Sequence, residues 1–161
     1  MLTKDRKFQI VVGALLFAVL AVSIISFALG PGRFQTRVLF FPRVLDQSVR
    51  GEERMVPVRG GTNATEANAE LLVQELILGP ADLQYAALLP VDTELQLFML
   101  RNDQVYMDLS AAAVTNRRNL IPSLDHAFAL VEQSLTFNFP SIADVHITIE
   151  GNLPNYPHYE F

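Results

Sequence analysis

The stretch Glu75–Pro90, ELILGPADLQYAALLP, ends one helix and leads into the strands that follow. Upstream of it, Asn63 or Thr65 can cap the helix, and Asn63 with Glu66 forms a capping-box pattern. Gly79-Pro80 ends the helix, because glycine adopts positive φ easily and proline cannot continue the helical ladder. Apolar residues at helical spacing predict one buried face: Ala69, Leu72, Val73, Leu76 and Ile77.

Two alternating segments follow this connector. TELQLFML at 93–100 and VYMDLS at 105–110 are separated by Asn102-Asp103. This pair tolerates positive φ and therefore predicts the tight turn of a β-hairpin. Successive side chains of a strand alternate between faces. We expect the apolar set to point inward: Leu95, Leu97, Met99, Val105, Met107 and Leu109.

Two further strands are predicted before the first helix. They are RVLFF at 37–41 and RMVPVR at 54–59, with a loop at 43–53. Pro57 suits an edge strand because it cannot donate to a ladder.

A loop, a second helix and a final strand are predicted after the hairpin. AAAVTNRRN at 111–119 is polar enough for an exposed loop, in which Arg117-Arg118 is solvated or contacts a small anion. The helix begins near Pro122 and stops before Pro140. Its apolar stripe is Leu124, Phe128, Val131, Leu135 and Phe139, and the strand that follows turns Val145, Ile147 and Ile149 inward.

These elements predict an α+β domain of order β-β-α-β-β-α-β. Because the hairpin forces antiparallel pairing, we expect a mostly antiparallel sheet with two helices on one face, preceded by one transmembrane helix.

The transmembrane helix is expected at 8–29, FQIVVGALLFAVLAVSIISFAL, which is 22 residues long and carries no charge. A bilayer core needs about 20 apolar residues in a helix, so this segment is long enough to act as a signal anchor. A cleaved signal peptide is the alternative, with Ser26-Phe27-Ala28 as the processing site, but its apolar region is usually about 7–15 residues long.

The basic tail 1–7 favours a cytoplasmic N-terminus and an exported domain. We expect a linker at 30–36, the domain at 37–151 and a Pro/Tyr-rich tail at 152–161. The protein is then a single-pass protein of the inner, or cytoplasmic, membrane.

Charge and cysteine content exclude several functions. Residues 30–161 hold nine arginines and sixteen acidic residues, a formal charge of about −7, whereas nucleic-acid binding needs a basic stripe. The chain has no cysteine, which excludes disulfides, thiolate metal ligands, a cysteine nucleophile and a lipidated cysteine. We expect no nucleic-acid partner.

Candidate catalytic groups lack the patterns that catalysis requires. The histidines at 126, 146 and 158 have no metal-ligand spacing, and Ser110 lacks a nucleophile elbow. The acidic residues Asp103, Asp108, Asp125, Glu132 and Glu150 form no selected pair of the glycosidase kind. We expect no enzyme activity, metal, cofactor or small-molecule substrate.

The outward sheet face is the candidate interaction surface. Strand alternation places exposed aromatic side chains there among polar groups, and such surfaces bind partners more often than purely charged ones. Its residues are Gln96, Phe98, Tyr106, Asp108, His146, Thr148 and Glu150. An ordinary solvated sheet face is the alternative.

The order of these segments resembles the GerMN domain of sporulation and germination proteins of the GerM type. The resemblance covers residues 37–151 and rests on the order and spacing of five landmarks rather than on any single one. The landmarks are ELLVQELILGP, LLPVDTEL, VYMDLS, VEQSLT and FPSIADVHITIEG.

The resemblance implies an extracytoplasmic, non-enzymatic domain similar to the ring-building modules of secretion and channel complexes. In spore formers such a protein belongs to the channel assembly between mother cell and forespore. Related lipoproteins carry the domain ahead of a propeller and work beside a sensor kinase. This sequence has one such domain, no propeller, and an apolar anchor in place of the lipidated cysteine.

We therefore expect a membrane-anchored envelope scaffold that binds itself or other envelope proteins. A small binding or regulatory domain for a cell-wall or peptide ligand is the alternative, and an envelope hydrolase comes third.

Overall fold

The computed structural model describes residues 12–13, 15–23, 34–117 and 120–154. Its contacts divide the chain into two units, Met1–Arg33 and Phe34–Phe161. In the first unit, residues 12–13 and 15–23 are helical. Within the described ranges, no helix is both long enough and apolar enough to cross a bilayer. The expected span at 8–29 and C-terminal tail at 152–161 lie partly outside those ranges, and the tail at 1–7 lies wholly outside them.

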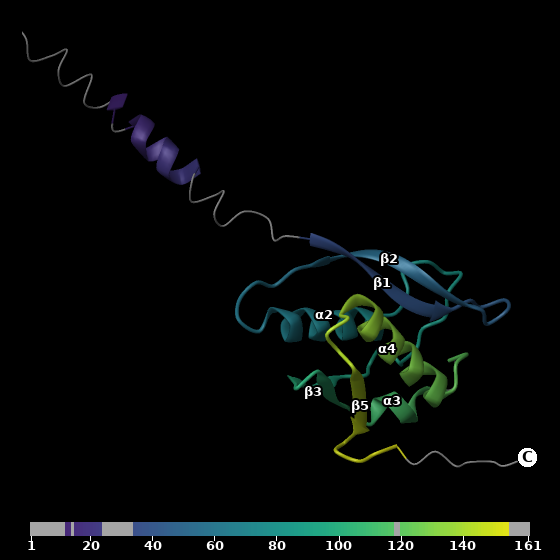
Figure 1. The fold of residues 1–161 in the computed structure, drawn as a ribbon. Coiled ribbons are helices and arrows are strands. Elements are labelled where there is room, and N and C mark those ends of the chain that lie inside the picture. The colour runs from purple at the N-terminus through teal and green to yellow at the C-terminus, as the bar shows by residue number, and fades with distance from the viewer. Residues whose placement is uncertain (1–11, 14, 24–33, 118–119, 155–161) are drawn as a thin grey trace, which may run out of the picture. The chain divides into compact units, whose positions relative to one another are not determined.

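The second unit has three layers (Figure 1). Strands β1 and β2 form an antiparallel ribbon, and β3, β4 and β5 form a second sheet in that order. Helices α2 and α4 lie between the ribbon and the sheet and contact both. The elements are β1 (Phe34–Pro42), β2 (Val49–Pro57), α2 (Ala64–Leu78), β3 (Leu95–Arg101), β4 (Gln104–Leu109), α3 (Ala112–Thr115), α4 (Leu124–Asn138) and β5 (Asp144–Ile149).

The predicted α+β class is correct, but the single, mostly antiparallel sheet with helices on one face is wrong. The strands form two sheets that share one helical layer. β5 pairs with β4 in parallel, since α3 and α4 carry the chain back to the end of the sheet at which β4 began. β3 and β4 are antiparallel, as a hairpin requires.

Helix α2 has the buried face that its sequence predicts. Ala69, Leu72, Val73, Leu76 and Ile77 are all in the core. Gly79 follows the last turn with φ 86°, where its N–H donates to the carbonyl of Leu76. The capping box is wrong, because Asn63 occupies the N-cap without a side-chain hydrogen bond.

Two segments expected to be loops contain regular structure. Residues 49–53 belong to β2, because pairing with β1 outweighs their local polarity. Residues 112–115 form α3, with Ala113 buried. Arg117 lies beside α3 and donates to the carbonyls of Leu88, Ala113 and Pro122, and burial lowers the pKa of its guanidinium. It is therefore held by the fold rather than solvated, and Arg118 lies outside the described residues.

The remaining predicted elements are present. Asn102 and Asp103 have φ of 50° and 63°, as the tight hairpin turn between β3 and β4 requires. The hydroxyl of Ser123 accepts from the backbone N–H of His126 and caps α4, which ends at Asn138, two residues before Pro140. Val145 and Ile149 of β5 pack against the core, and Ile147 is buried in it.

Candidate interaction surface

The outer face of the β3-β4-β5 sheet carries an aromatic pair. Tyr106 of β4 lies opposite His146 of β5, and the two rings stack with centroids 4.9 Å apart and an interplanar angle of 25°. The Tyr106 hydroxyl donates to Gln104 Oε1 at 2.7 Å, and His146 Nε2 lies 3.3 Å from Asp144 Oδ2. The partly exposed rings are therefore held in place by neighbours on their own strands.

A polar pair continues this face toward the end of β4. Asp108 lies opposite Thr148, whose hydroxyl donates to Asp108 Oδ1 at 2.6 Å. The backbone N–H of Gly151 donates to the same oxygen at 2.9 Å. These hydrogen bonds, from Thr148 first and Gly151 second, hold the pKa of Asp108 below its ordinary value. The Asp108 carboxylate therefore ties β5 and the turn after it to β4.

The expected outward position of Phe98 is wrong. A β-bulge between Leu95 and Leu97 shifts the register of β3. Phe98 then lies opposite the buried Met107 and packs against the core. Leu97 and Met99 lie opposite Asp108 and Tyr106 instead, so they replace Phe98 on the outer face. Alternation alone gave no signal of this shift, because residues 97–100 are all apolar.

Gln96 and Glu150 meet at one end of the sheet. Gln96 lies at the bulge, and its side-chain amide donates to Glu150 Oε1 at 3.1 Å. Glu150 follows β5 with φ 50°, and the same oxygen accepts from the backbone N–H of Ala111 at 2.9 Å. The seven predicted residues thus divide into four on the face, two at its end and one, Phe98, that packs against the core. We define the sheet face as Leu97, Met99, Tyr106, Asp108, His146 and Thr148.

Ser110, His126 and His146, the candidates for catalysis or metal binding, lie on or next to separate elements. The Ser110 hydroxyl accepts from the backbone N–H of Glu94 and so fixes the end of β4 beside the start of β3. His126 lies in the first turn of α4, whereas His146 lies on the sheet face. Among the residues that the structure describes, no three His, Asp or Glu side chains are grouped as metal ligands.

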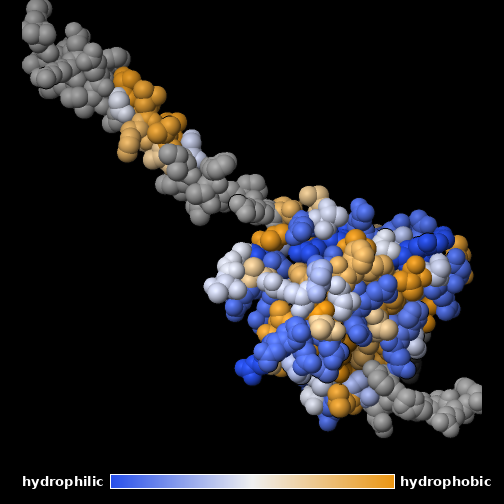
Figure 2. Space-filling model, in the orientation of Figure 1, coloured by the Kyte–Doolittle hydropathy of each residue, from blue (hydrophilic) through white to orange (hydrophobic). Residues whose placement is uncertain are grey.

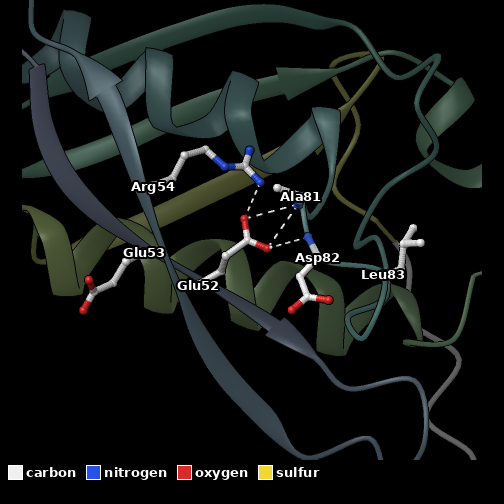
Figure 3. Close-up of a pocket in the computed structure, with 6 residues that line it drawn as sticks. All are labelled: Glu52, Glu53, Arg54, Ala81, Asp82 and Leu83. Atoms are coloured by element: carbon white, nitrogen blue, oxygen red, sulfur yellow. Dashed lines mark hydrogen bonds and ion pairs between the residues drawn. The ribbon is translucent and has the colours of Figure 1, made fainter.

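The connector after α2 is held by β2 through an ion network (Figure 3). The Glu52 carboxylate pairs with Arg54 and accepts from the backbone N–H groups of Ala81 and Asp82. Arg54 also reaches Glu75 at 2.8 Å and the carbonyl of Gly79 at 3.0 Å. Burial lowers the pKa of Arg54, but the hydrogen bonds to Glu75 and Glu52 outweigh it and the net pKa is raised. The network fixes the chain where it leaves α2, which explains why the helix ends sharply before this connector.

An open hollow of about 560 Å³ lies beside this network. It is lined by Glu52, Glu53, Arg54, Ala81, Asp82 and Leu83. Figure 3 shows Glu53 pointing away from the network, while Glu52 lies between Arg54 and the connector. The Glu52 carboxylate therefore already has its hydrogen-bond partners within the domain.

The family described as Germane, sporulation and spore germination, matches residues 38–153. The chain belongs to this family. The match runs from β1 to just beyond β5 and so includes both sheets and the helices between them. No protein with a curated description matches the chain in sequence.

Solved structures of GerMN domains share the fold of this Germane domain. The first GerMN domain of the sporulation protein GerM from Bacillus subtilis is 19% identical, with a TM-score of 0.52 over 74% of this chain and 86% of that chain. The tandem GerMN domains of the same protein are 15% identical, with a TM-score of 0.56 over 78% of this chain. The match spans only 44% of the tandem structure. A candidate lipoprotein from Clostridium perfringens is 25% identical, with a TM-score of 0.48 over 75% of this chain and 78% of that chain.

Proposed function

We propose that this protein is a membrane-anchored scaffold of the cell envelope whose Germane domain binds copies of itself or other envelope proteins outside the cytoplasm. The proposal rests on the partly exposed Tyr106–His146 pair of the sheet face, which lies in a domain of the sporulation and germination family. The family includes sporulation proteins, as the GerM structures illustrate, and a sporulation or germination complex is therefore the setting that this scaffold fits best.

The composition of the sheet face supports binding to protein. Leu97 is 53% exposed, and it stands beside Met99 and the stacked Tyr106–His146 pair. Tyrosine and methionine are enriched in protein interfaces, and a polar rim usually surrounds an apolar centre. Asp108 and Thr148 provide such a rim at one end, and their hydrogen bonds keep that end rigid.

The apolar segment 8–29 supports anchoring, with the N-terminus inside the cytoplasm and the domain outside. The proposal includes no catalytic step. Ser110, His126 and His146 lie on or next to separate elements, and the scaffold is proposed to act by binding.

The test is crosslinking of the anchored protein in cells, followed by identification of what it captures. We expect Leu97→Glu combined with Tyr106→Glu to abolish the captured oligomers or partners, because two charges would be buried at the contact. Gln74→Glu is the matched control, because it adds a charge at an exposed position of α2. Capture that survives the double substitution in a folded protein would remove the sheet face from the proposal.

A second candidate function, binding of a cell-wall or peptide ligand, is favoured by the hollow beside the connector. Glu52 is occupied there, so a ligand would meet Glu53, Asp82 and Leu83. Retention of the protein on purified cell-wall material that is lost in Asp82→Lys and kept in the Leu97→Glu, Tyr106→Glu variant would favour this function over the scaffold.

A further inference from the structure

The β1-β2 ribbon has an outer face that the core uses only in part, through the half-buried Phe40 and Val49. Residues opposite one another in an antiparallel pair project to the same side. The pairs that include Leu39, Phe41 and Val56 turn those side chains into the core. The alternate pairs therefore face outward, and they place Phe34, Val38 and Phe40 on the same side as Met55. Gly51 confirms this arrangement, because a Cβ added to it would lie 2.5 Å from Val38 Cγ1.

This outer face is mostly apolar and partly exposed, since Val38 and Phe40 are half-buried and the exposed Glu53 lies among the outward pairs. Phe34 is 55% exposed and Met55 is 69% exposed. Phe137 of α4 extends the face, since its ring is 59% exposed and meets Phe40 edge to face at 5.3 Å. Figure 2 shows hydrophobic atoms where the ribbon begins. Single exposed apolar residues are ordinary, but a contiguous group marks an interaction site. We define the ribbon face as Phe34, Val38, Phe40, Met55 and Phe137.

The ribbon differs in charge from the rest of the domain. Residues 33–59 hold six arginines and three acidic residues, a formal charge of +3. Residues 60–161 hold three arginines and thirteen acidic residues, a formal charge of −10. Arg50 and Arg59 are exposed within the cationic part. Arg37, Arg43 and Arg54 are engaged within the domain, by the Asn138 carbonyl, Asp46 and the Glu52–Glu75 pair respectively. A positive charge beside an apolar face fits an anionic partner. The lipid headgroup layer and the acidic remainder of a second copy are both anionic, so it is the position of the ribbon next to the proposed anchor that favours lipid.

The ribbon is also the part of the domain that directly follows the proposed anchor. Phe34 begins β1, and only residues 30–33 separate it from the apolar segment 8–29. A chain of this length spans at most about 18 Å. The tether therefore limits how far the start of the ribbon can move from a membrane that holds the anchor.

We propose that the ribbon face rests on the anionic lipid surface of the membrane in which the N-terminal segment is anchored. The inference rests on the anchor of the proposed function. Phe34, Met55 and Phe137 enter the headgroup layer, as the apolar faces of interfacial segments do. Arg59, just beyond β2, contacts lipid phosphates at the edge of the ribbon face. Arg50, which lies opposite Phe41 and projects from the other side of the ribbon, adds to the local positive charge. Contact at the ribbon leaves the sheet face, on the other side of the helical layer, open to partners.

Tryptophan fluorescence tests this contact in the full chain, which contains no tryptophan of its own. Met55→Trp places the probe on the ribbon face, and Leu97→Trp places it on the sheet face as the matched control. Each protein is reconstituted into vesicles of phosphatidylglycerol and phosphatidylethanolamine with brominated acyl chains. We expect blue-shifted emission and quenching by bromine at position 55, and no quenching at position 97.

Charge variants of the Met55→Trp protein test the electrostatic part. Arg50→Glu combined with Arg59→Glu should reduce quenching, whereas Arg101→Glu, at an exposed position of β3, should not. Glu53 lies opposite Val38 and is the acidic residue of the outward pairs, so Glu53→Gln should increase quenching. Quenching that is unchanged by the Arg50→Glu, Arg59→Glu double substitution, by Glu53→Gln and by vesicle charge would overturn the role assigned to anionic lipid.

The remaining outcomes separate this inference from the anchor. Alkaline carbonate extraction reports the anchor, whereas quenching at position 55 reports the ribbon. A protein that resists extraction but shows no quenching keeps the anchor and overturns the inference. Quenching in a protein that is extracted supports lipid contact and removes the anchor. A blue shift without quenching indicates contact with a second copy and overturns the inference.

Discussion

Gly51 has no side chain at a point where the ribbon has no room for one. It lies opposite Phe40, and an added Cβ would meet Val38 Cγ1 at 2.5 Å. The branched side chain of valine is restricted at χ1 and therefore gives way poorly. We expect Gly51→Ala to lower the free energy of unfolding by about 1–3 kcal/mol through overpacking. Gly60→Ala is the control, since a Cβ there meets nothing within 4 Å. Equal midpoints of urea unfolding for the two variants would contradict the prediction.

Asp108 makes part of the stability dependent on acid pH. Hydrogen bonds from Thr148 and Gly151 hold its pKa below the ordinary value of 3.8. A carboxyl with a lower pKa in the folded state stabilises the fold above its unfolded-state pKa, and this contribution is lost as pH falls through the folded-state value. We therefore expect the Tm of the Asp108→Asn variant to fall less than the Tm of the parent protein when the pH is lowered below the ordinary pKa of 3.8. Parallel curves of Tm against pH for the two proteins would show that Asp108 contributes nothing.

Among the elements, α4 closes the free edge of β1 with side chains instead of a strand. The Asn138 side-chain amide accepts from the N–H of Val38 at 3.0 Å and donates to the carbonyl of Val38. Ser134, fully buried one turn earlier, accepts from the N–H of Phe40 at 3.0 Å. Asn68 of α2 forms the same two-sided pairing with the backbone of Arg59, just beyond β2. An exposed strand edge is a template for aggregation, and these amides remove the template.

We expect Asn138→Ala to open that edge. The N–H and carbonyl of Val38 lose their partner, which costs about 1–3 kcal/mol of stability when a buried group is left unsatisfied. The freed edge should also promote self-association, measured by light scattering against concentration. Gln133→Ala, at an exposed position of the same helix, should change neither property. A destabilised variant that stays monomeric would mean that the amide stabilises without protecting the edge.

Elements with strong local signals could be predicted from the sequence. The spacing of Leu72, Val73 and Leu76 and the stop at Gly79 define α2 without reference to the rest of the chain. Four residues of the sheet face, Tyr106, Asp108, His146 and Thr148, followed from period-two alternation in β4 and β5. The position of Phe98 did not, because a run of apolar residues fits either phase of alternation and the bulge decides between them. The strand at residues 49–53 and the separation of the ribbon from the other sheet could not be predicted. They depend on pairing with β1 and on contacts with α4, which no local sequence pattern reveals.

At the scale of the whole molecule, the helical layer separates two exposed surfaces with different chemistry. The sheet face mixes the Tyr106–His146 ring pair with apolar and polar side chains, while the ribbon face is mostly apolar and belongs to the part of the chain with net positive charge. A scaffold with one surface for lipid and another for protein must have a fixed topology across the membrane. The orientation of the chain is therefore the property on which both proposals depend.

A reporter that is active only outside the cytoplasm tests that orientation. We expect activity when it is fused after Phe161 and none when it is fused before Phe8, because the basic tail 1–7 is retained inside. Leu16→Arg combined with Leu20→Arg should release the protein from the membrane, since each charge at mid-span costs about 2.5–3.5 kcal/mol on insertion scales. Leu45→Arg, in the turn after β1, is the control and should remain anchored. Activity of the N-terminal fusion alone would reverse the topology.

The closure of β1 by Asn138 also sets an order of events during synthesis. Val38 leaves the ribosome 100 residues before the amide that pairs with it. A β-hairpin forms in about 1–10 μs, so the ribbon can pair long before α4 exists. Translation at about 5–20 residues per second then leaves the far edge of β1 bare for roughly 5–20 s in every newly made chain. A chaperone that shields extended strands is most useful to this protein during that interval. The need for the chaperone ends when α4 forms and Asn138 pairs with β1.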